Sequence, residues 1–294
     1  MNNTAKDILD KTVKKIDGAY SYATIRAYKA DFIKFIGFCN LNNSLALPAT
    51  SQSIVNFIIQ LIYDGLCSAS IRRSVAGISA IHRLNRLEDP TKDPDVNIEM
   101  RRMHRKLGRF GKQAYGVSKT ELQLMVNSQD DSIHGIRNKA LLLTAYDTLC
   151  RRGELIQLLV QDLKFNEDGT GQVLLRKSKV DQEAKGNILK FDLETTKAIK
   201  TWLDNSKIEK GFLFRGIDRE RKLNESLSVG QINKIFKKIA HDAKLNKETI
   251  NKISGHSFRV GAARDLAQNG NDFPTLMSKG RWSKIDTVMK YIQS

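Results

Sequence analysis

The sequence predicts a two-domain protein that is mainly α-helical, with a small β-sheet or hairpin in the second domain. A chain of 294 residues is long enough for two ordinary hydrophobic cores. Apolar residues recur at helical spacing through most of the chain, and two short segments show strand character. A basic segment containing glycines interrupts the pattern. We therefore expect a helical domain at residues 1–107, a linker at 108–116 and a mixed domain at 117–294.

Three amphipathic helices are expected in the first domain. Residues 25–36 place their apolar side chains on one helical stripe. A serine cap precedes a second helix over residues 54–63. The third helix runs from about residue 70 to residue 84, and the Asp-Pro pairs at 89–90 and 93–94 end it. The first domain is therefore predicted to be small, basic and all-helical.

The second domain is expected to combine helices with two strands. Residues 171–175 and 187–191 are predicted to form a hairpin around a polar turn that contains Lys177 and Lys179. Helical patterns cover six further segments, namely residues 137–150, 153–163, 193–203, 230–244, 256–268 and 283–292.

The charge balance favours a polyanion as the partner. The chain has 49 Lys and Arg against 32 Asp and Glu, a formal net charge of +17. Both halves are basic, and residues 100–120 contain no acidic residue, whereas a solvated helix normally interleaves the two signs. This distribution is typical of a nucleic-acid-binding protein.

Several other classes of protein are excluded. The polar first ten residues and the interrupted apolar stretch at 54–63 fit neither a signal peptide nor a membrane span. The three cysteines are far apart and include no C-x-x-C pair, which argues against a disulfide framework or a zinc ribbon. The sequence has no P-loop, dinucleotide fingerprint or H-E-x-x-H motif. We therefore expect a cytoplasmic protein.

Two pairs of residues could bind and orient a phosphate. His256 and Arg259 are three residues apart on one face of a predicted helix, where the guanidinium can donate to two oxygens and the imidazole can relay a proton. Arg151 and Glu154 have the same spacing, which lets a carboxylate hold a guanidinium still. Taken alone, each pair is better explained as a surface ion pair or a local salt bridge.

Three more side chains join the candidate set. Lys179 lies in the hairpin turn, where most lysines are only solvated. Trp282 would ordinarily be a core or interface anchor. Tyr291 lies at the edge of the buried stripe of the 283–292 helix, where a half-buried structural tyrosine is the default explanation. The order and spacing of the whole set indicate a function that no member indicates by itself.

In order, the candidate residues resemble the catalytic set of the tyrosine recombinases of the phage integrase superfamily, of the Cre type: Arg151, Lys179, His256, Arg259, Trp282 and Tyr291. The resemblance is dense in residues 145–149, 254–265, 280–282 and 288–292. It is looser in the first half, at residues 70–73, 81–83 and 100–103. The set is specific for the family, but it does not identify a DNA site.

The resemblance implies a C-shaped, two-domain DNA clamp that acts as a site-specific recombinase. Such enzymes form a tetramer on two recombination sites, with a dimer on each site, and cleave DNA through a 3'-phosphotyrosyl intermediate. In this reading the first domain binds the core DNA site and the second is catalytic. The context that it implies is a nucleoid-associated protein of a prokaryote, phage, plasmid or other mobile element.

The resemblance also assigns a role to each candidate residue. Tyr291 is the nucleophile, and Lys179 is the general acid that protonates the leaving 5'-oxygen. Arg151 and Arg259 neutralise the transition state, and His256 and Trp282 donate further hydrogen bonds to the phosphoryl oxygens. Glu154 supports the site without touching the substrate. The covalent intermediate conserves bond energy, so no metal, cofactor or small-molecule substrate is expected.

Ten residues are expected to contact the DNA. In the first domain they are basic side chains of the 70–84 helix and of the segment near residue 100, namely Arg72, Arg73, Arg101, Arg102, Arg105 and Lys106. In the second domain the 230–244 helix presents amides and amines that suit base edges in the major groove, from Gln231, Asn233, Lys234 and Lys237.

The sequence departs from the Cre-type pattern at two places. Ser294 ends the sequence three residues after Tyr291, where family members usually carry a helix that docks into a neighbouring protomer. Either the chain is truncated or assembly uses other contacts. Arg281 stands where a glycine is common before the tryptophan, which leaves the conformation of that loop open.

Three alternative functions stay open at this point. A type IB topoisomerase shares the arginine, lysine, histidine and tyrosine chemistry but relaxes supercoils without partner strands. A catalytically silent DNA-binding protein could use the same clamp. A basic RNA-binding module is the third, weakened by the lack of an RRM or KH pattern.

Overall fold

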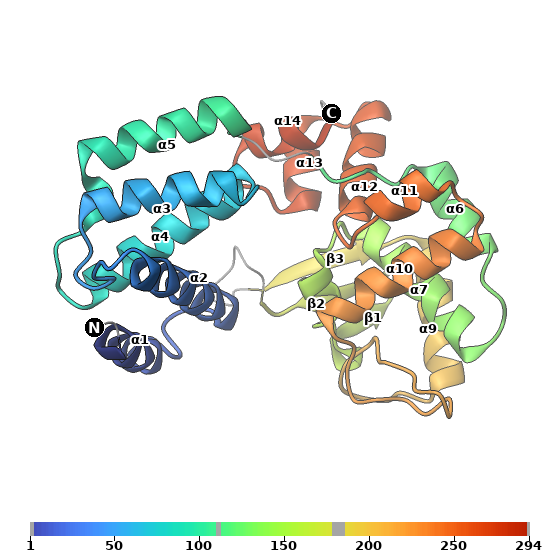
Figure 1. Ribbon diagram of the computed structural model, residues 1–294. Helices are drawn as coiled ribbons and strands as arrows, with labels where there is room; N and C mark the ends of the chain where they lie inside the picture. Colours follow the sequence, from blue (N-terminus) through green and yellow to red (C-terminus); the bar gives the residue numbers. More distant parts are fainter. Residues whose placement is uncertain (1–2, 110–112, 178–185, 293–294) are drawn as a thin grey trace. The chain divides into compact units, whose positions relative to one another are not determined.

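The computed structural model describes residues 3–109, 113–177 and 186–292. The chain divides into two compact units, Met1–Lys112 and Gln113–Ser294, and each has its own hydrophobic core (Figure 1). The predicted fold class is confirmed, because helices dominate both units and a small antiparallel sheet lies in the second. No helix in the described ranges is long and apolar enough to cross a membrane.

The described part of unit 1 consists of α-helices and one 3-10 turn: α1 (Asn3–Lys15), α2 (Tyr22–Leu41), α3 (Ser51–Tyr63), α4 (Ser68–Leu84), η1 (Pro90–Lys92) and α5 (Pro94–Leu107). The predicted helices at 25–36, 54–63 and 70–84 are confirmed within α2, α3 and α4. Their apolar faces meet in one core, where the ring of Phe35 lies 5.0 Å from that of Phe57 and 5.9 Å from that of Phe32.

The sequence pattern does not predict α1 and α5, for two different reasons. α1 has an apolar face that includes the buried Ala5 and Leu9, but most of its residues are polar or charged. In α5, Pro94 takes the first helical position, where its missing N–H costs no hydrogen bond, and the Asp93 side chain accepts from the N–H of Asp95. The Asp-Pro pair at 93–94, which was expected to end the helix before it, therefore starts α5.

Unit 2 surrounds its core with helices on a three-stranded sheet: α6 (Lys119–Asn127), α7 (Ile133–Asp147), α8 (Arg152–Leu155), η2 (Val160–Asp162), β1 (Leu163–Phe165), β2 (Gly171–Leu175), β3 (Asn187–Phe191), α9 (Leu193–Ser206), α10 (Val229–Asp242), α11 (Lys247–Lys252), α12 (Ser257–Gln268), α13 (Phe273–Gly280) and α14 (Ile285–Ile292). The predicted hairpin is β2 and β3, which pair antiparallel with Val173 opposite Leu189.

The helix predicted over residues 153–163 is wrong. α8 ends at Leu155, because the following backbone pairs with a distant segment instead of with itself. The Leu213 N–H donates to the Leu158 carbonyl at 2.8 Å, and the Val160 N–H donates to the Gly211 carbonyl at 2.9 Å. The chain then enters β1, which pairs with β2 and turns the predicted hairpin into a sheet. β1 is too short to show an alternating pattern in the sequence.

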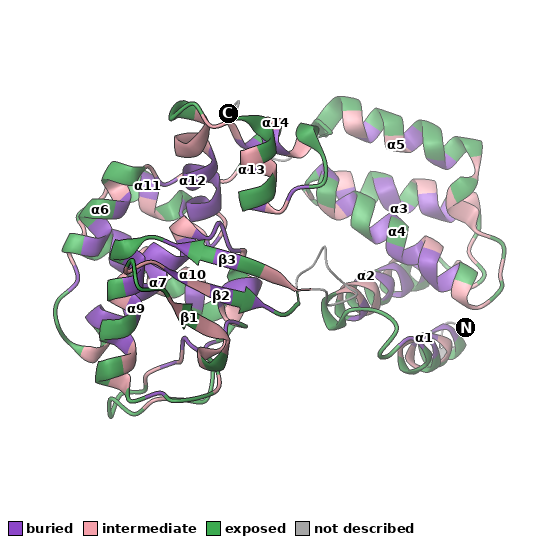
Figure 2. Ribbon diagram, turned by 180° about the vertical axis from the view of Figure 1, so that it is seen from behind, coloured by how far each residue is buried: buried purple, intermediate pink, exposed green. Residues whose placement is uncertain are grey.

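α7 is the centre of the unit 2 core. Leu141, Leu142 and Leu143 are all buried, so this part of the helix is covered on all sides, as its purple colour in Figure 2 indicates. It packs against α9 and α12. The packing of α7 therefore fixes the position of its last residue, Asp147, and Arg151 follows four residues later.

α12 is fixed by the segment that opens unit 2. The Val117 N–H donates to the Ser257 carbonyl at 3.1 Å, and the Lys119 N–H donates to Asp265 Oδ2 at 3.1 Å. The approach is so close that a side chain at Gly261 would overlap the Val117 carbonyl. α12 carries Arg259, and His256 is its N-cap residue; the glycine lets the chain run directly along this helix.

Candidate active site

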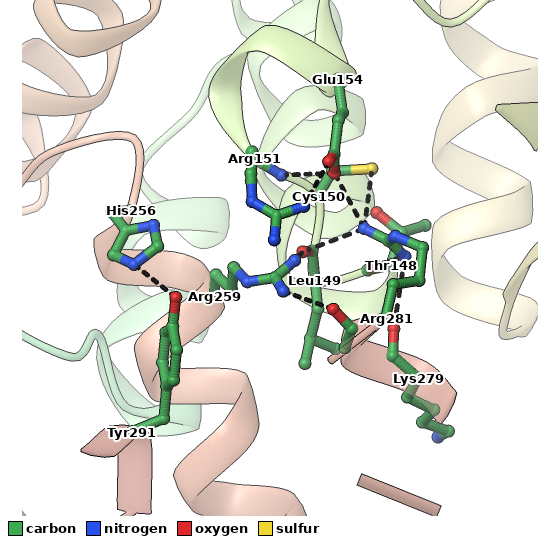
Figure 3. Close-up of polar contacts among 11 residues, drawn as sticks. Thr148, Leu149, Cys150, Arg151, Glu154, His256, Arg259, Lys279, Arg281 and Tyr291 are labelled. Carbon is green, nitrogen blue, oxygen red and sulfur yellow. Dashed lines mark hydrogen bonds and ion pairs between the residues drawn. The ribbon is translucent and has the colours of Figure 1, made fainter. Parts of the chain in front are cut away.

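Arg151 and Glu154 form a rigid pair at the start of α8. Arg151 is the N-cap residue, and its backbone N–H donates to Glu154 Oε2 at 3.0 Å. Its guanidinium Nη1 donates to Oε1 of the same carboxylate at 2.6 Å (Figure 3). The Glu154 side chain is buried, whereas 25% of the Arg151 side chain is exposed. The spacing predicted this pairing, and the exposed part of Arg151 remains available to a ligand.

Arg259 is fully buried on α12 and reaches two other segments. Its Nη1 donates to the Leu149 carbonyl at 2.5 Å, and its Nη2 donates to the Gly280 carbonyl. Leu149 has φ 50°, a left-handed conformation that is uncommon for leucine, in the turn between α7 and α8. Burial and the nearby Arg151 guanidinium lower the pKa of Arg259 to about 10, so it is still a cation at neutral pH.

Tyr291 and His256 come together from α14 and from the N-terminus of α12. The Tyr291 hydroxyl lies 2.7 Å from His256 Nε2, and Tyr291 is 9% exposed. The His256 turn is held by its own sequence, because the Ser257 hydroxyl accepts from the Ser254 N–H at 3.0 Å. Burial, Arg259 and Arg151 lower the pKa of His256 to about 4, so the imidazole is neutral at neutral pH.

Trp282 packs between the arginine and the tyrosine. Its ring centroid lies 4.9 Å from that of Tyr291 and 4.7 Å from Cζ of Arg259. Its indole Nε1 is buried and has no hydrogen-bond partner among the described residues, and the same holds for Arg259 Nε. Buried donors are rarely left unpaired. The site therefore presents donors that an anion could satisfy.

The structure brings together five of the six predicted catalytic residues, Arg151, His256, Arg259, Trp282 and Tyr291. The sixth, Lys179, lies in the segment 178–185, outside the described residues. The other five form one cluster, in which Arg259, Trp282 and Tyr291 are buried and Arg151 and His256 are partly exposed.

The sequence reasoning missed Arg281 as a member of the site. Its guanidinium Nη2 donates to Glu154 Oε2 at 2.9 Å, and its Nη1 donates to the Thr148 carbonyl at 3.0 Å (Figure 3). Its presence in place of the common glycine was the available signal. The spacing gave no indication of Glu154 as the partner, because the two residues are far apart in the sequence.

In unit 1 all six residues predicted to contact DNA are exposed, and two of them also pair with a carboxylate. Arg73 makes two hydrogen bonds to the buried carboxylate of Asp31, at 2.7 and 3.0 Å, which tie α4 to α2. Arg102 Nη1 lies 3.0 Å from Glu99 on its own helix. The other four are exposed on α4 and α5, namely Arg72, Arg101, Arg105 and Lys106.

On α10, three of the four residues predicted to read bases already have partners. Gln231 closes the capping box with Ser228, and Lys237 Nζ donates to the Asn251 carbonyl at 3.0 Å. Asn233 Oδ1 accepts from the Gly255 N–H at 2.8 Å. Lys234 is exposed. Gln231 therefore caps its own helix, and Asn233 ties the helix to the segment of Gly255. The sequence pattern did not predict these structural roles.

Comparison with known proteins gives relatives along nearly the whole chain. An integrase/recombinase XerD homolog of Selenomonas ruminantium is 29% identical over 294 aligned residues, which cover 96% of this chain and 85% of the relative. The Cre recombinase of Escherichia phage P1 is 28% identical over 275 aligned residues, covering 87% of this chain and 80% of the relative.

Solved structures show the same fold. The XerH site-specific recombinase in a post-cleavage complex with difH substrate matches with a TM-score of 0.70 and 20% identity, over 96% of this chain and 79% of that one. The Tn1549 transposon integrase with transposon right end DNA matches with a TM-score of 0.68 and 13% identity, over 97% and 94%. The model of the phage integrase family matches residues 117–294. The chain therefore belongs to the phage integrase family and is a tyrosine recombinase, as its sequence predicted.

Proposed function

We propose that this chain is a site-specific recombinase that cleaves and rejoins duplex DNA through a 3'-phosphotyrosyl intermediate. The observation that carries the proposal is the 2.7 Å contact between the Tyr291 hydroxyl and His256 Nε2, beside buried donors of Arg259 and Trp282. A phenol becomes a nucleophile when a neighbouring base accepts its proton. The same small volume therefore holds a nucleophile, a base and donors for an anion.

The reaction is a transesterification in which the number of bonds is conserved. The Tyr291 oxygen forms a bond to phosphorus while the bond from phosphorus to the 5'-oxygen breaks, and its electron pair stays on that oxygen. His256, neutral at neutral pH, accepts the phenolic proton. Lys179 protonates the leaving 5'-oxygen. Attack by a 5'-hydroxyl of the partner strand reverses these steps and rejoins the DNA.

Arg151, Arg259 and Trp282 stabilise the transition state. Negative charge grows on the non-bridging phosphoryl oxygens as the phenolic oxygen adds. The exposed part of Arg151, the unpaired Nε of Arg259 and the indole Nε1 of Trp282 offer donors to that charge. Because the Arg151 guanidinium is held by Glu154, it needs little rearrangement when the charge develops. Donation from His256 to a phosphoryl oxygen remains a prediction of the family resemblance.

The proposal includes the assembly and the division of labour between domains. The domain at residues 1–107 binds the core DNA site, residues 108–116 form the linker, and the domain at 117–294 carries the chemistry. A dimer occupies each site, and a tetramer holds two duplex sites for strand exchange. The relatives are recombinases of bacteria and a phage, which supports a cytoplasmic, nucleoid-associated protein.

A covalent trapping experiment tests the central step. The duplex is first selected from a random pool by its binding to Tyr291→Phe, and is then nicked so that the strand bearing the 5'-hydroxyl diffuses away. The wild-type chain should become covalently attached to this DNA, with ATP absent and EDTA present, and peptide mapping should place the link on Tyr291. Tyr291→Phe should bind equally well and trap nothing. A link to Tyr146 or to a serine would refute the mechanism.

A further inference from the structure

Arg281 connects three segments of the site from the end of α13. Its Nη2 donates to Glu154 Oε2 at 2.9 Å and to the Leu149 carbonyl at 3.3 Å, and its Nη1 donates to the Thr148 carbonyl at 3.0 Å. Only 8% of its side chain is exposed. Trp282 follows it directly in the chain, so these contacts join the segment of Trp282 to the turn that carries Arg151.

The backbone at Arg281 is unfavourable for any residue with a side chain. Its φ is 55°, in the left-handed region that glycine adopts without strain. A glycine here would cost less in backbone free energy and would make none of the side-chain contacts. The conformation of the turn therefore does not require an arginine, and what the arginine adds is its set of side-chain hydrogen bonds.

Glu154 is shared between two guanidinium groups. Arg151 occupies Oε1 with its side chain and Oε2 with its backbone N–H, and Arg281 is a second donor to Oε2. With Arg151 as its only charged partner, the carboxylate would cancel much of the positive charge that a phosphate needs. A second cation on the same carboxylate leaves Arg151 with more net attraction for an anion.

We propose that Arg281 is a positioning residue of this recombinase, which acts through Glu154 on Arg151 and through the backbone on Trp282. The inference rests on the proposed function, because it assigns Arg281 to the orientation of two groups that stabilise the phosphoryl transition state. It predicts an effect on the cleavage step and little effect on DNA binding.

The test compares variants on the selected, nicked duplex. Arg281→Gly removes the side chain and relieves the left-handed backbone, so any loss of rate does not come from a strained turn. We expect its single-turnover trapping rate to fall by about 100-fold, the scale of a small misplacement in an active site. Its Kd for the duplex should change by less than about threefold. The exposed neighbour Lys279, changed to alanine, is the control for loss of one positive charge in the same turn.

Two further variants test whether Arg281 positions the catalytic groups or only supports the fold: a conservative replacement of Arg281 and a double variant with Glu154. Arg281→Lys keeps one cation near Glu154 and should recover part of the rate. Arg281→Gly combined with Glu154→Gln should be no slower than the slower single variant, because both changes interrupt the same path. Independent losses in the double variant, or a Lys279→Ala loss as large as that of Arg281→Gly, would overturn the proposal.

The pH dependence of trapping gives a third readout. Burial raises the pKa of Glu154, but the Arg151 N–H, Arg281 and the Arg151 side chain together bring it below its ordinary value. The groups that face this carboxylate are Arg151, Arg281, Arg259 and the Cys150 thiol. Without Arg281 the carboxylate should accept a proton at higher pH and release Arg151. The acid limb of the rate should therefore move to higher pH in Arg281→Gly.

The outcomes distinguish this inference from the proposed function. If the wild-type chain traps DNA through Tyr291 and Arg281→Gly traps it equally fast with an unchanged pH profile, the recombinase function stands and the role of Arg281 is refuted. If the wild-type chain does not trap DNA, the proposed function itself fails. Thermal unfolding of each variant shows whether a slow variant is still folded at the temperature of the trapping assay.

Discussion

At the scale of single residues, the protonation state of His256 decides what the Tyr291 hydroxyl can do. Burial and three nearby arginines keep the imidazole neutral at neutral pH, with Nε2 2.7 Å from the phenolic oxygen. A neutral imidazole can accept the phenolic proton, whereas a protonated one cannot. The positive cluster that we propose binds the phosphate therefore also keeps the proposed base neutral.

The shifted pKa of His256 predicts a pH-dependent stability. The folded protein has this pKa near 4, while the unfolded chain has it near the ordinary value of 6.5, so the unfolded chain binds more protons between these limits. Stability should fall as the pH is lowered through this window, by up to roughly 1.4 kcal/mol per pH unit from this residue. Denaturant unfolding between pH 7 and pH 4 should show a weaker pH dependence for His256→Gln than for the wild type. If the difference in unfolding free energy between His256→Gln and the wild type were the same at every pH, the assigned pKa of His256 would be contradicted.

The proposed general acid predicts a rescue by a better leaving group. Lys179→Ala should cleave ordinary DNA slowly, because the departing 5'-oxygen is then not protonated. On a duplex with sulfur at the 5'-bridging position its rate should return close to that of the wild type, since a thiolate leaves without protonation. Arg259→Ala, which lacks charge stabilisation, should stay slow on both substrates. Equal recovery of both variants would show that Lys179 is not the acid.

At the scale of elements, α10 supports the loop that carries His256. The Asn233 side-chain oxygen accepts from the Gly255 N–H, and a Cβ at Gly255 would lie 2.8 Å from Cβ of Arg152, well inside van der Waals contact. The helix that the sequence marked as a reader of bases therefore also positions a catalytic loop. Its exposed Lys234 is the residue of the four best placed to meet solvent and DNA phosphates.

Asn233 and Lys234 should respond differently to substitution. Asn233→Ala removes the acceptor of the Gly255 N–H, so we expect a trapping rate lower by about fivefold, because one hydrogen bond contributes on the order of 1 kcal/mol. Its DNA affinity should change little. Lys234→Ala should weaken affinity on all sequences and keep the rate of the bound complex. A broadened sequence preference in Asn233→Ala, with an unchanged rate, would favour base reading instead.

The sequence predicted the helices that have a long apolar stripe and missed those defined by their ends. α2, α3 and α4 were predictable because each buries one continuous face. α6 was not, although Ser118 and Glu121 form a capping box, because its apolar stripe is short. β1 depends on pairing with β2, and pairing over a distance in the chain leaves no local pattern.

The site was predictable to the extent that it depends on residue identity and order. The family resemblance selected five residues that the fold brings to one cluster from α8, α12, α14 and the turn after α13. The hydrogen bond of Arg281 to Glu154 was not predictable, because it depends on the left-handed backbone at residue 281 and on a partner from another helix. Both are set by tertiary packing.

At the scale of the whole molecule, the positive charge is distributed over both units. Of the 49 basic residues, 18 lie in residues 1–115, against 10 acidic ones, and the rest of the chain is also basic. Neutralising DNA phosphates releases counterions from the duplex, so such binding depends steeply on salt.

The affinity of Tyr291→Phe for the selected duplex should therefore fall with salt. If each unit contributes several phosphate contacts, Kd should rise on the order of 10³-fold between 50 and 200 mM salt. Neutral replacement of Arg101 and Arg105 together should lower the slope of log Kd against log salt by about two, whereas Asn233→Ala should leave it unchanged. A nearly flat salt dependence would contradict the electrostatic binding of DNA by both units.

The close passage of the chain along α12 sets where the catalytic half can be separated. Ala114 and Tyr115 pack on the unit 2 clusters, and the Val117 N–H pairs with the first residue of α12. Gly116 and Gly261 let the two backbones touch. These residues precede or only begin the segment that the family shares, yet they belong to the same folding unit. A stand-alone fragment of the second unit would have to begin at residue 113 or earlier, because cutting at the family boundary would remove the packing of Ala114, Tyr115 and Gly116 on unit 2.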